Sequence, residues 1–323
     1  MTNPSMNTQT LTGLILTIQH FCTHDGPGIR TNVFFKQCSL RCKWCSNPES
    51  ILRKPELGYK PAQCIGRKEC GACLKAPFPE GALYVVDGAD DKVHVNWDLA
   101  GDVDAQMVSL CPTGALNMFG KRMTVDEVLA EVEQDSSFYR ESGGGITLSG
   151  GECLLQPDFS AALLAEARQR GLHTAIETAG NVPWTSFEKV LPYVDLVQHD
   201  RKLTDPARHK KWTGVDNRNI NANFEKAYAT FPETKFIART PVIPGVNDDE
   251  EHIRVVLASI RPFPNVIDYE LLPYHRFGES KYGFLGRVYE LEDFQSPTPE
   301  SMQRLQAIID EAFGRTAKPA KAG

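Results

Sequence analysis

Apolar runs and amphipathic segments alternate along most of the 323-residue chain. Short stretches rich in β-branched and other apolar residues predict strands, and segments with apolar residues at helical spacing predict helices. The predicted strands cover residues 12–21, 31–36, 146–149, 173–178, 194–198, 235–242 and 266–272. The predicted helices follow Thr124, begin near Trp184, and cover residues 158–170, 217–229, 248–260 and 298–313.

This alternation predicts an α/β fold in which a parallel sheet is covered by helices. Thr124 and Glu127 have the spacing of a capping box that begins the first of these helices. A closed barrel of eight units typically needs more chain than the regular part of this sequence provides. In such sheets ligands gather at the carboxyl ends of the strands, so residues that follow the strands are expected to share one rim.

Residues 51–122 interrupt the pattern. Proline and glycine are frequent there, and helical periodicity is poor. We therefore predict three parts: residues 1–50 begin the main domain and carry a cysteine-rich loop, residues 51–122 form an insert, and residues 123–323 complete the main domain and end with a helix.

Composition and charge exclude several classes of function. The chain has an ordinary globular composition and a net charge of -6, which argues against a nucleic-acid partner. Its apolar runs are too short to span a membrane, and residues 1–12 are polar without a signal-peptide core. We expect a cytoplasmic protein, in which the nine cysteines are metal ligands rather than disulfides.

Cys38, Cys42 and Cys45 form a C-x3-C-x2-C group, one thiolate fewer than usually holds an iron–sulfur cube. A four-iron cluster held by three cysteines leaves one iron open to a small molecule. Two alternatives remain. A structural zinc site usually has four ligands in paired spacings, and a disulfide would leave one of the three cysteines free.

A second group, Cys64, Cys70, Cys73 and Cys111, lies in the insert and ends in Cys111-Pro112. A Cys-Pro ending is typical of bacterial ferredoxins, although the C-x5-C-x2-C spacing departs from their pattern. Four cysteines suffice for one closed auxiliary 4Fe-4S cluster, and a zinc ribbon is the alternative. The two remaining cysteines, Cys22 and Cys153, stand apart, and we interpret Cys153 as a packing residue.

Motifs around the first cysteine group carry a family resemblance. Trp44 precedes the last cysteine, the stretch His24-Asp-Gly-Pro-Gly-Ile-Arg30 precedes the group, and Ser46-Asn-Pro-Glu49 follows it. Together they resemble the radical S-adenosylmethionine superfamily and, within it, the activating enzymes of glycyl radical enzymes. The resemblance extends from about Leu14 to about Tyr282 and implies a partial (β/α)6 barrel with a ferredoxin-like insert.

The same resemblance implies roles for residues of the rim. It places Gly150-Gly151-Glu152 near the amino group of S-adenosylmethionine and Glu177 near the ribose or a monovalent cation. Asp200 is expected in that cation or ribose region, and Lys202 beside the cofactor carboxylate, where it joins the three cysteines as a catalytic group. The predicted cofactor-binding set is completed by Trp44, Cys45, Ser46, Arg201, Arg239 and His275.

Position in the sequence supports the expectations for Arg239 and His275 and adds a further one for Asp25 and Arg30. Arg239 interrupts an apolar strand, so it should face the barrel interior and a carboxylate. His275 follows a strand end and matches a family motif, which favours contact with the adenosine part. Asp25 and Arg30 flank a Gly-Pro-Gly turn and are expected to face an incoming protein.

The resemblance implies reductive cleavage of S-adenosylmethionine and removal of a hydrogen atom from a glycine of a partner glycyl radical enzyme. We expect two 4Fe-4S clusters, a flavodoxin or ferredoxin as electron donor, a monomer and an anaerobic setting. The partner is expected to be a carbon–sulfur lyase of the isethionate sulfite-lyase type, with a dehydratase, decarboxylase or choline lyase still open. The alternatives are a radical enzyme that acts on a small molecule and a two-cluster electron-transfer protein.

Overall fold

The computed structural model describes residues 11–86, 90–101, 103 and 105–315. Most of the polar N-terminal segment used in the localisation argument lies outside these ranges. Eight strands form the main sheet, in the order β12 (Val266–Pro273), β11 (Lys235–Val242), β10 (Leu196–Asp200), β9 (His173–Thr178), β8 (Gly145–Gly150), β2 (Arg30–Phe35), β1 (Thr12–Cys22) and β7 (Lys121–Thr124).

The strands from β12 to β2 are all parallel, which confirms the predicted α/β class with a mostly parallel sheet. β1 pairs antiparallel with both β2 and β7. Because β7 belongs to the main sheet, the boundary predicted at residue 122 falls inside a strand. The sequence pattern could not reveal this, since β7 pairs with a strand more than a hundred residues earlier.

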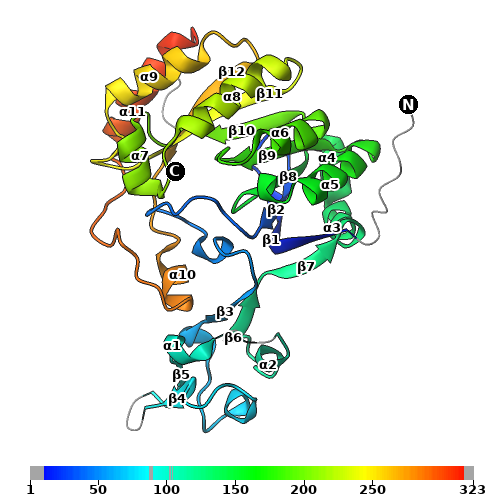
Figure 1. Ribbon diagram of the computed structural model, residues 1–323, viewed down its shortest axis with the longest axis vertical. Coiled ribbons are helices and arrows are strands. Elements are labelled where there is room, and N and C mark those ends of the chain that lie inside the picture. Colours follow the sequence, from blue (N-terminus) through cyan, green and yellow to red (C-terminus); the bar gives the residue numbers. More distant parts are fainter. Residues whose placement is uncertain (1–10, 87–89, 102, 104, 316–323) are drawn as a thin grey trace.

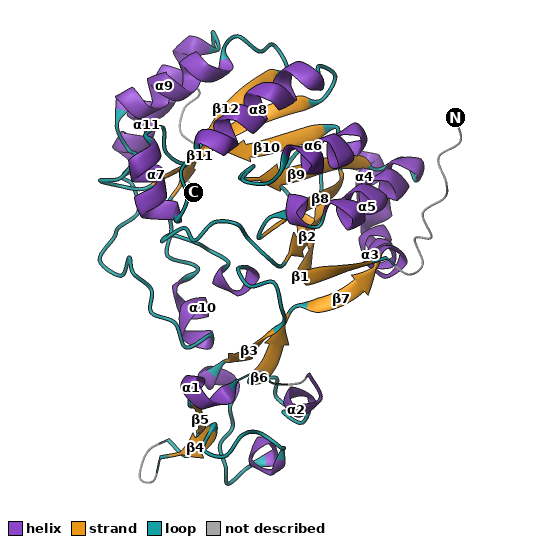
Figure 2. Cartoon of the chain, in the orientation of Figure 1, coloured by secondary structure: helices purple, strands orange, loops and turns teal. Residues whose placement is uncertain are grey.

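Helices lie along the outer side of the curved sheet (Figures 1 and 2). Those predicted are α3 (Val125–Val132), α5 (Pro157–Gln169), α6 (Trp184–Val190), α8 (Arg218–Thr230), α9 (Glu250–Ile260) and α11 (Pro299–Ala312). The structure adds α4 (Ser136–Ser142), α7 (Pro206–Thr213) and α10 (Glu279–Phe284). These three are short and largely polar, so their apolar periodicity is too weak to predict a helix. None of the described helices combines the length and apolarity needed to cross a membrane.

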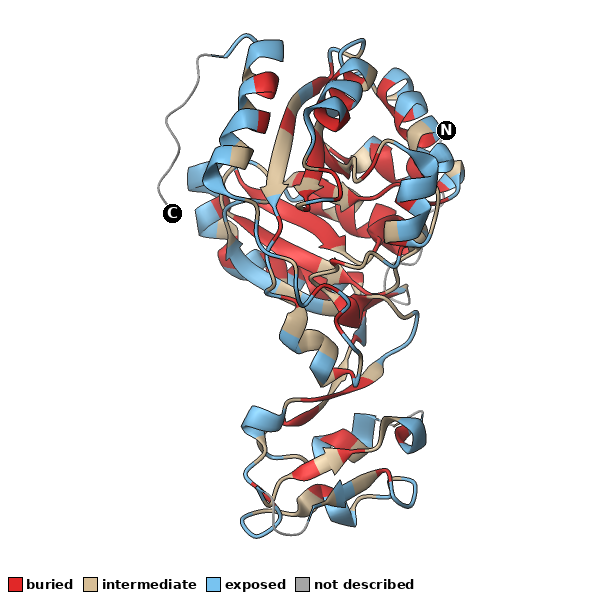
Figure 3. Ribbon diagram, turned by 90° about the vertical axis from the view of Figure 1, so that its left-hand side faces the viewer, coloured by how far each residue is buried: buried red, intermediate tan, exposed pale blue. Residues whose placement is uncertain are grey.

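Apolar side chains of the sheet and helices form one large core. Its aromatic part includes Phe187, Phe224 and Phe236, none of which is exposed. The buried strands at the centre of the main domain are visible in Figure 3. Cys153 belongs to this core as well, in agreement with the packing role expected for it.

Residues 56–119 form a lobe that projects from the main domain (Figures 1 and 3). It contains β3 (Glu56–Tyr59) paired with β6 (Leu116–Phe119), β4 (Leu83–Val85) paired with β5 (Val93–Val95), and the short helices α1 (Trp97–Ala100) and α2 (Ala105–Ser109). A separate small apolar cluster, which includes Leu57, Val93 and Leu116, fills its interior.

Charged residues join this lobe to the main domain. The fully buried Lys36 donates from Nζ to Glu56 Oε1 at 2.9 Å and to the Glu49 carbonyl at 2.6 Å. Arg287 donates to the other carboxylate oxygen of Glu56 at 2.5 Å. Because a buried ammonium is costly without a partner, Glu56 fixes the start of the lobe beside the end of β2.

The structure contains the predicted capping box. Thr124 Oγ1 accepts from the Glu127 backbone N–H at 3.2 Å, and the Glu127 carboxylate accepts from the Thr124 N–H at 2.7 Å. We predict that Thr124→Ala lowers the free energy of unfolding by about 1 kcal/mol, because one N-terminal N–H of α3 loses its acceptor. Denaturant unfolding measures this. Ser137→Ala, at an exposed helical position, is the control and should cause no loss.

Candidate active site

One cavity of about 320 Å³ opens where the parallel strands end. It brings together residues from the loop after β2 and from the ends of β8, β9, β10, β11 and β12, as the rim argument predicted. Of the predicted site residues, those that line it are Cys38, Cys42, Trp44, Cys45, Ser46, Gly150, Gly151, Glu177, Asp200, Lys202 and Arg239.

The cysteine loop begins with a sharp change of backbone direction at Gln37, whose φ is 80°. Gln37 donates to the Ser50 carbonyl at 2.7 Å, and Cys38 donates to the Ile51 carbonyl at 3.1 Å. Further along the loop, Arg41 donates to the carbonyl of Thr213 at the end of α7. The loop is therefore held on both sides by backbone hydrogen bonds, which fixes where its thiols point.

Burial raises the pKa of the three thiols, to about 12 for Cys38 and Cys42 and to about 11 for Cys45. Such thiols remain protonated unless a metal cation supplies compensating positive charge. All three thiols line the same cavity, where they are available together as metal ligands.

The glycine pair after β8 is required by backbone packing. Gly150 has a φ of 103°, and a Cβ there would lie 2.3 Å from the Phe35 nitrogen. A Cβ on Gly151 would lie 2.3 Å from the Gln37 carbonyl oxygen. The turn thus packs directly against the start of the cysteine loop, and both glycines also line the cavity.

Glu152 does not line the cavity, although sequence reasoning included it in the cofactor-binding set. Its carboxylate is fully buried and accepts from Thr178 Oγ1 at 2.7 Å and from the backbone N–H groups of Ala179 and Gly180 at 3.0 and 3.3 Å. These donors lie at the end of β9 and in the loop that follows it. Glu152 is therefore a positioning residue that ties the end of β8 to the end of β9.

Arg239 pairs with two carboxylates, as its place in an apolar strand predicted. It forms an ion pair with Glu177, donates from Nε to Glu270 at 2.8 Å, and donates from Nη2 to the His24 carbonyl at 2.8 Å. Glu177 also accepts from the Ser149 hydroxyl. Burial nevertheless raises the pKa of Glu177 to about 7, against the opposite effect of Arg239.

Two of these residues escaped the sequence analysis. Glu270 stands directly beside Arg239 in the register of β11 and β12, and Ser149 precedes the glycine pair. The alternation of strand residues could have indicated that Glu270 and Arg239 share a face once their strands were aligned. Ser149 carries no such signal, because serine is common at strand ends.

Asp200 and Lys202 form a close pair, with Lys202 Nζ 2.6 Å from Asp200 Oδ2. Burial acts to lower the pKa of Lys202. The negative charges of Asp200 and, to a smaller extent, Cys42 have the larger effect, so the pKa is raised. Arg201 points away, because its Nη2 donates to Ser259 Oγ on α9 at 3.1 Å. The structure thus brings Asp200 and Lys202 to the cavity and leaves Arg201 outside it.

His275 and Arg30 are not where sequence reasoning put them. His275 is exposed and stacks on Phe277 with 4.3 Å between ring centroids, outside the cavity. The expectation that Arg30 faces an incoming protein was wrong, since the side chain is fully buried and donates to Thr147 Oγ1 at 2.6 Å. Asp25 lines the cavity and accepts from Asn32 Nδ2 at 2.6 Å.

The second cysteine group gathers in the lobe. Cys73 belongs to the apolar cluster of the lobe, and Cys64 and Cys111 pack against that cluster. Burial raises the pKa of the Cys73 thiol, and the nearby Cys111, Cys64 and Cys70 raise it further. Backbone N–H groups point at two of the sulfurs, from Ala72 to Cys70 Sγ at 3.5 Å and from Leu116 to Cys111 Sγ at 3.4 Å. Tyr59 adds a buried hydroxyl that lies beside Cys64. This donor set fits an iron–sulfur group, whose sulfurs commonly accept such hydrogen bonds.

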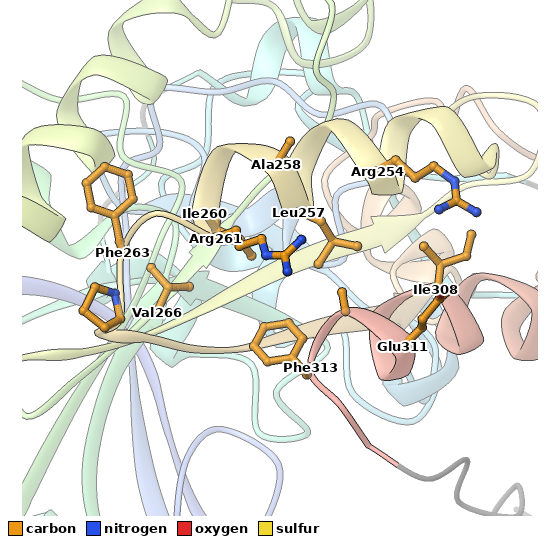
Figure 4. A pocket seen from close by; sticks show the side chains of 12 residues that line it. Arg254, Leu257, Ala258, Ile260, Arg261, Phe263, Val266, Ile308, Glu311 and Phe313 are labelled. Carbon is orange, nitrogen blue, oxygen red and sulfur yellow. The ribbon is translucent and has the colours of Figure 1, made fainter.

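A larger cavity of about 600 Å³ lies between α9, the start of β12 and α11. Figure 4 shows Arg261 next to Leu257 in the middle of this cavity and Arg254 near Ile308 at one end of it. Its lining contains no thiol and a single carboxylate, from Glu311, so it lacks the groups that could hold a redox centre.

The raised pKa of Glu177 predicts a pH dependence of stability. The folded protein holds this proton up to about pH 7, whereas the unfolded chain releases it near pH 4.3, as is usual for glutamate. Glu177 therefore contributes stability that is lost as pH rises from about 4.5 to 7. We predict that Glu177→Gln lacks this loss. The difference in unfolding free energy between the variant and the wild type should therefore shift by about 1–3 kcal/mol in favour of the variant between pH 4.5 and pH 7. Thermal unfolding at several pH values measures the difference, and parallel pH profiles would contradict it.

Comparison with known proteins identifies the family. Residues 109–256 match the Radical SAM superfamily. The chain is 44% identical over 298 residues to the isethionate sulfite-lyase activating enzyme of Nitratidesulfovibrio vulgaris, which covers 92% of this chain and 95% of that protein. It is 47% identical over 299 residues to the (2S)-3-sulfopropanediol sulfolyase activating enzyme of Bilophila wadsworthia, with 92% and 96% covered.

Among solved structures, a domain of a pyruvate-formate lyase-activating enzyme from Bacteroides vulgatus is 26% identical. It covers 55% of this chain and 99% of that domain, with a TM-score of 0.44. The curated relatives confirm the resemblance inferred from the cysteine motifs. The chain belongs to the radical S-adenosylmethionine superfamily and, within it, to the activating enzymes of glycyl radical enzymes.

Proposed function

We propose that this protein activates a glycyl radical enzyme that breaks a carbon–sulfur bond, with isethionate sulfite-lyase as the first candidate. The observation that carries the proposal is the single cavity that joins three cysteine thiols to the charged residues at the strand ends. The family implies a 4Fe-4S cluster and S-adenosylmethionine, which together supply the one-electron cleavage that lets a hydrogen atom be taken from a glycine of the partner.

In this proposal Cys38, Cys42 and Cys45 hold three irons and leave the fourth facing the cavity. Gly150 and Gly151 give the cofactor amino group close access to the backbone. The Lys202 ammonium already donates to Asp200 and can also donate to the cofactor carboxylate. A cofactor that fills this cavity of about 320 Å³ would displace the water in it, which protects a reactive radical.

Glu177 and Asp200 both reach the cavity and supply carboxylate oxygens. We propose that one of them contacts the ribose and that the pair can share a monovalent cation. The cavity also contains the Asp25 side chain, which therefore lies near the place that a partner glycine must reach. Asp25 therefore remains a candidate contact with the partner. The buried Arg30 does not reach the partner, but it donates to the Pro27 carbonyl at 3.0 Å and so helps to hold the turn that follows Asp25.

For the lobe we propose one auxiliary 4Fe-4S cluster held by Cys64, Cys70, Cys73 and Cys111 in a ferredoxin-like domain. The N–H groups aimed at two of the sulfurs and the buried Tyr59 hydroxyl support this proposal. The cluster would relay electrons from a flavodoxin or ferredoxin to the catalytic site of a monomeric, cytoplasmic enzyme.

The choice of partner rests on the relatives. Both the isethionate sulfite-lyase and the (2S)-3-sulfopropanediol sulfolyase activators align along nearly the whole chain, at 44% and 47% identity. Relatives named for decarboxylases are less similar, such as the indoleacetate decarboxylase activator at 39%. Isethionate sulfite-lyase is the first candidate because activators named for it match in three organisms, at 44% to 46% identity. The second candidate is a sulfopropanediol sulfolyase, which also handles a sulfonate.

The test is activation of purified partner enzymes under anaerobic conditions. We predict that the reduced protein with S-adenosylmethionine produces a glycyl radical signal on isethionate sulfite-lyase and forms 5′-deoxyadenosine. Cys42→Ala should abolish both, whereas Cys22→Ser, a change at a cysteine outside both cysteine groups, should keep both.

A signal on the sulfopropanediol sulfolyase alone would select the second candidate. A radical on a decarboxylase or dehydratase, with none on either sulfonate lyase, would refute the proposed partner class. Abundant 5′-deoxyadenosine with no radical on any partner would favour a small-molecule substrate instead.

The auxiliary cluster has its own test. We predict that Cys111→Ser lowers the iron content from about eight to about four atoms per chain, while S-adenosylmethionine is still cleaved with dithionite as reductant. Iron and zinc analysis of the anaerobically reconstituted protein measures this, with Cys22→Ser as the matched control. About one zinc per chain, or an unchanged iron content in the variant, would contradict the assignment.

A further inference from the structure

The turn between β1 and β2, residues 23–29, is held by side chains that point into the barrel. Arg239 of β11 donates from Nη2 to the His24 carbonyl at 2.8 Å. Arg30, at the start of β2, donates from Nη1 to the Pro27 carbonyl at 3.0 Å. Two strands far apart in the sheet order therefore fix this turn on both sides of Asp25.

Asp25 itself accepts from three buried polar side chains. Asn32 Nδ2 donates to Asp25 Oδ2 at 2.6 Å, and Thr147 Oγ1 donates to the Asp25 carbonyl at 2.9 Å. With its amide oriented so that both ends are paired, Gln198 donates to the same carbonyl at 3.2 Å and accepts from Arg239 at 2.9 Å. Asn32, Thr147 and Gln198 lie on β2, β8 and β10 and are 1%, 0% and 2% exposed.

These three donors form a layer of side chains next to the lining of the catalytic cavity. Residues two positions apart on a strand share a face of the sheet. Two positions further along the three strands are Phe34, Ser149 and Asp200, and all of these line the cavity. The turn held by the layer is therefore the floor of the cavity, and Asp25 is the residue of the turn that reaches the lining.

The turn and the cysteine loop belong to opposite ends of β2. The turn precedes Arg30, the first residue of this strand, and the cysteine loop follows Phe35, its last residue. A strand of six residues is about 20 Å long. A cofactor anchored at the cysteine loop thus has the floor on its far side, which is the side left for the hydrogen donor.

Stability does not account for the burial of Asn32. Its Nδ2 donates to Asp25, but its Oδ1 has no hydrogen-bond partner within the described part of the chain. A buried amide with an unpaired acceptor costs stability. Local departures of this kind are expected where a residue serves a function rather than the fold.

We propose that Asn32, Thr147 and Gln198 are positioning residues for the partner's glycine; this rests on the contact between Asp25 and the partner proposed above. A glycine has no side chain, so its backbone N–H and carbonyl are the groups that can be recognised. Asn32 holds one carboxylate oxygen of Asp25 and leaves the other to accept a backbone N–H of the glycine segment. Thr147 and Gln198 fix the Asp25 backbone, which keeps the glycine Cα at a constant place beneath the cofactor.

The test is a double-mutant cycle read by the KM for the partner enzyme. The probe is isethionate sulfite-lyase, or whichever glycyl radical enzyme the wild type activates. We expect Asn32→Leu, which removes the donor at similar size, to raise this KM about tenfold, a usual effect of losing a hydrogen bond to a charged group. The KM for S-adenosylmethionine should not change. In the Asp25→Ala background, Asn32→Leu should add nothing.

Asn265→Leu is the matched control. Asn265 is 5% exposed, and its Nδ2 donates to the carbonyls of Tyr228 and Phe231 at 3.0 and 3.1 Å, outside this cavity. This variant should lose stability and keep the KM for the partner. Gln198→Met, which keeps the length of the side chain, is the second test variant and should also raise that KM.

An equal KM for the partner in wild type and Asn32→Leu would overturn the proposal. A tenfold increase that persists in the Asp25→Ala background would also overturn it, because Asn32 would then act without Asp25. If Asn32→Leu does not fold, the same cycle with Gln198→Met decides. A wild type that activates a decarboxylase or dehydratase but neither sulfonate lyase refutes the proposed partner class, and the cycle with that enzyme still decides the role of the three residues.

Discussion

The close approach of two backbone turns determines the geometry of the site. The glycine pair after β8 packs so tightly on Gln37 that a single Cβ at Gly151 would collide with a carbonyl oxygen. Glu152 continues the contact, since its N–H donates to the Gln37 carbonyl at 2.8 Å while its carboxylate holds the loop after β9. Three segments far apart in sequence are thereby fixed around one cavity. A cluster loop positioned in this way keeps its thiols aimed at the strand ends without contributing to the sheet itself.

The same enclosure determines how the charged residues at the strand ends are paired. Burial disfavours every ionised group there, so the charged residues occur in partnered sets. Arg239 has Glu177 and Glu270, and Lys202 has Asp200. Among these carboxylates, Glu177 is the one whose ionised form is least stabilised, because its pKa rises to about 7 in spite of Arg239. Such a group gains most from a further polar or cationic contact, which is what a bound cofactor would provide.

Much of the fold could be predicted from sequence because its strands are short, apolar and bounded by clear signals. The bounds of β9 and β11 match the predicted ranges, and the capping box placed the start of α3. Pairing partners were harder, since the antiparallel placement of β1 and the membership of β7 depend on contacts between distant segments. In the site, the cysteine spacing located the cluster loop. Neighbouring residues could not be assigned individually: Arg201 and Lys202 differ by one position but face opposite ways, and His275 turns outward beyond the end of its strand.

The central claim is that three thiols hold a cluster whose fourth iron faces the cavity. Electron paramagnetic resonance of the anaerobically reduced protein, recorded with and without S-adenosylmethionine, tests it most directly. The account predicts that the cofactor changes the signal of one cluster, the one that Cys42→Ala removes, and leaves the auxiliary signal unaltered. A spectrum that S-adenosylmethionine does not change, at cofactor concentrations that saturate binding, would contradict the claim.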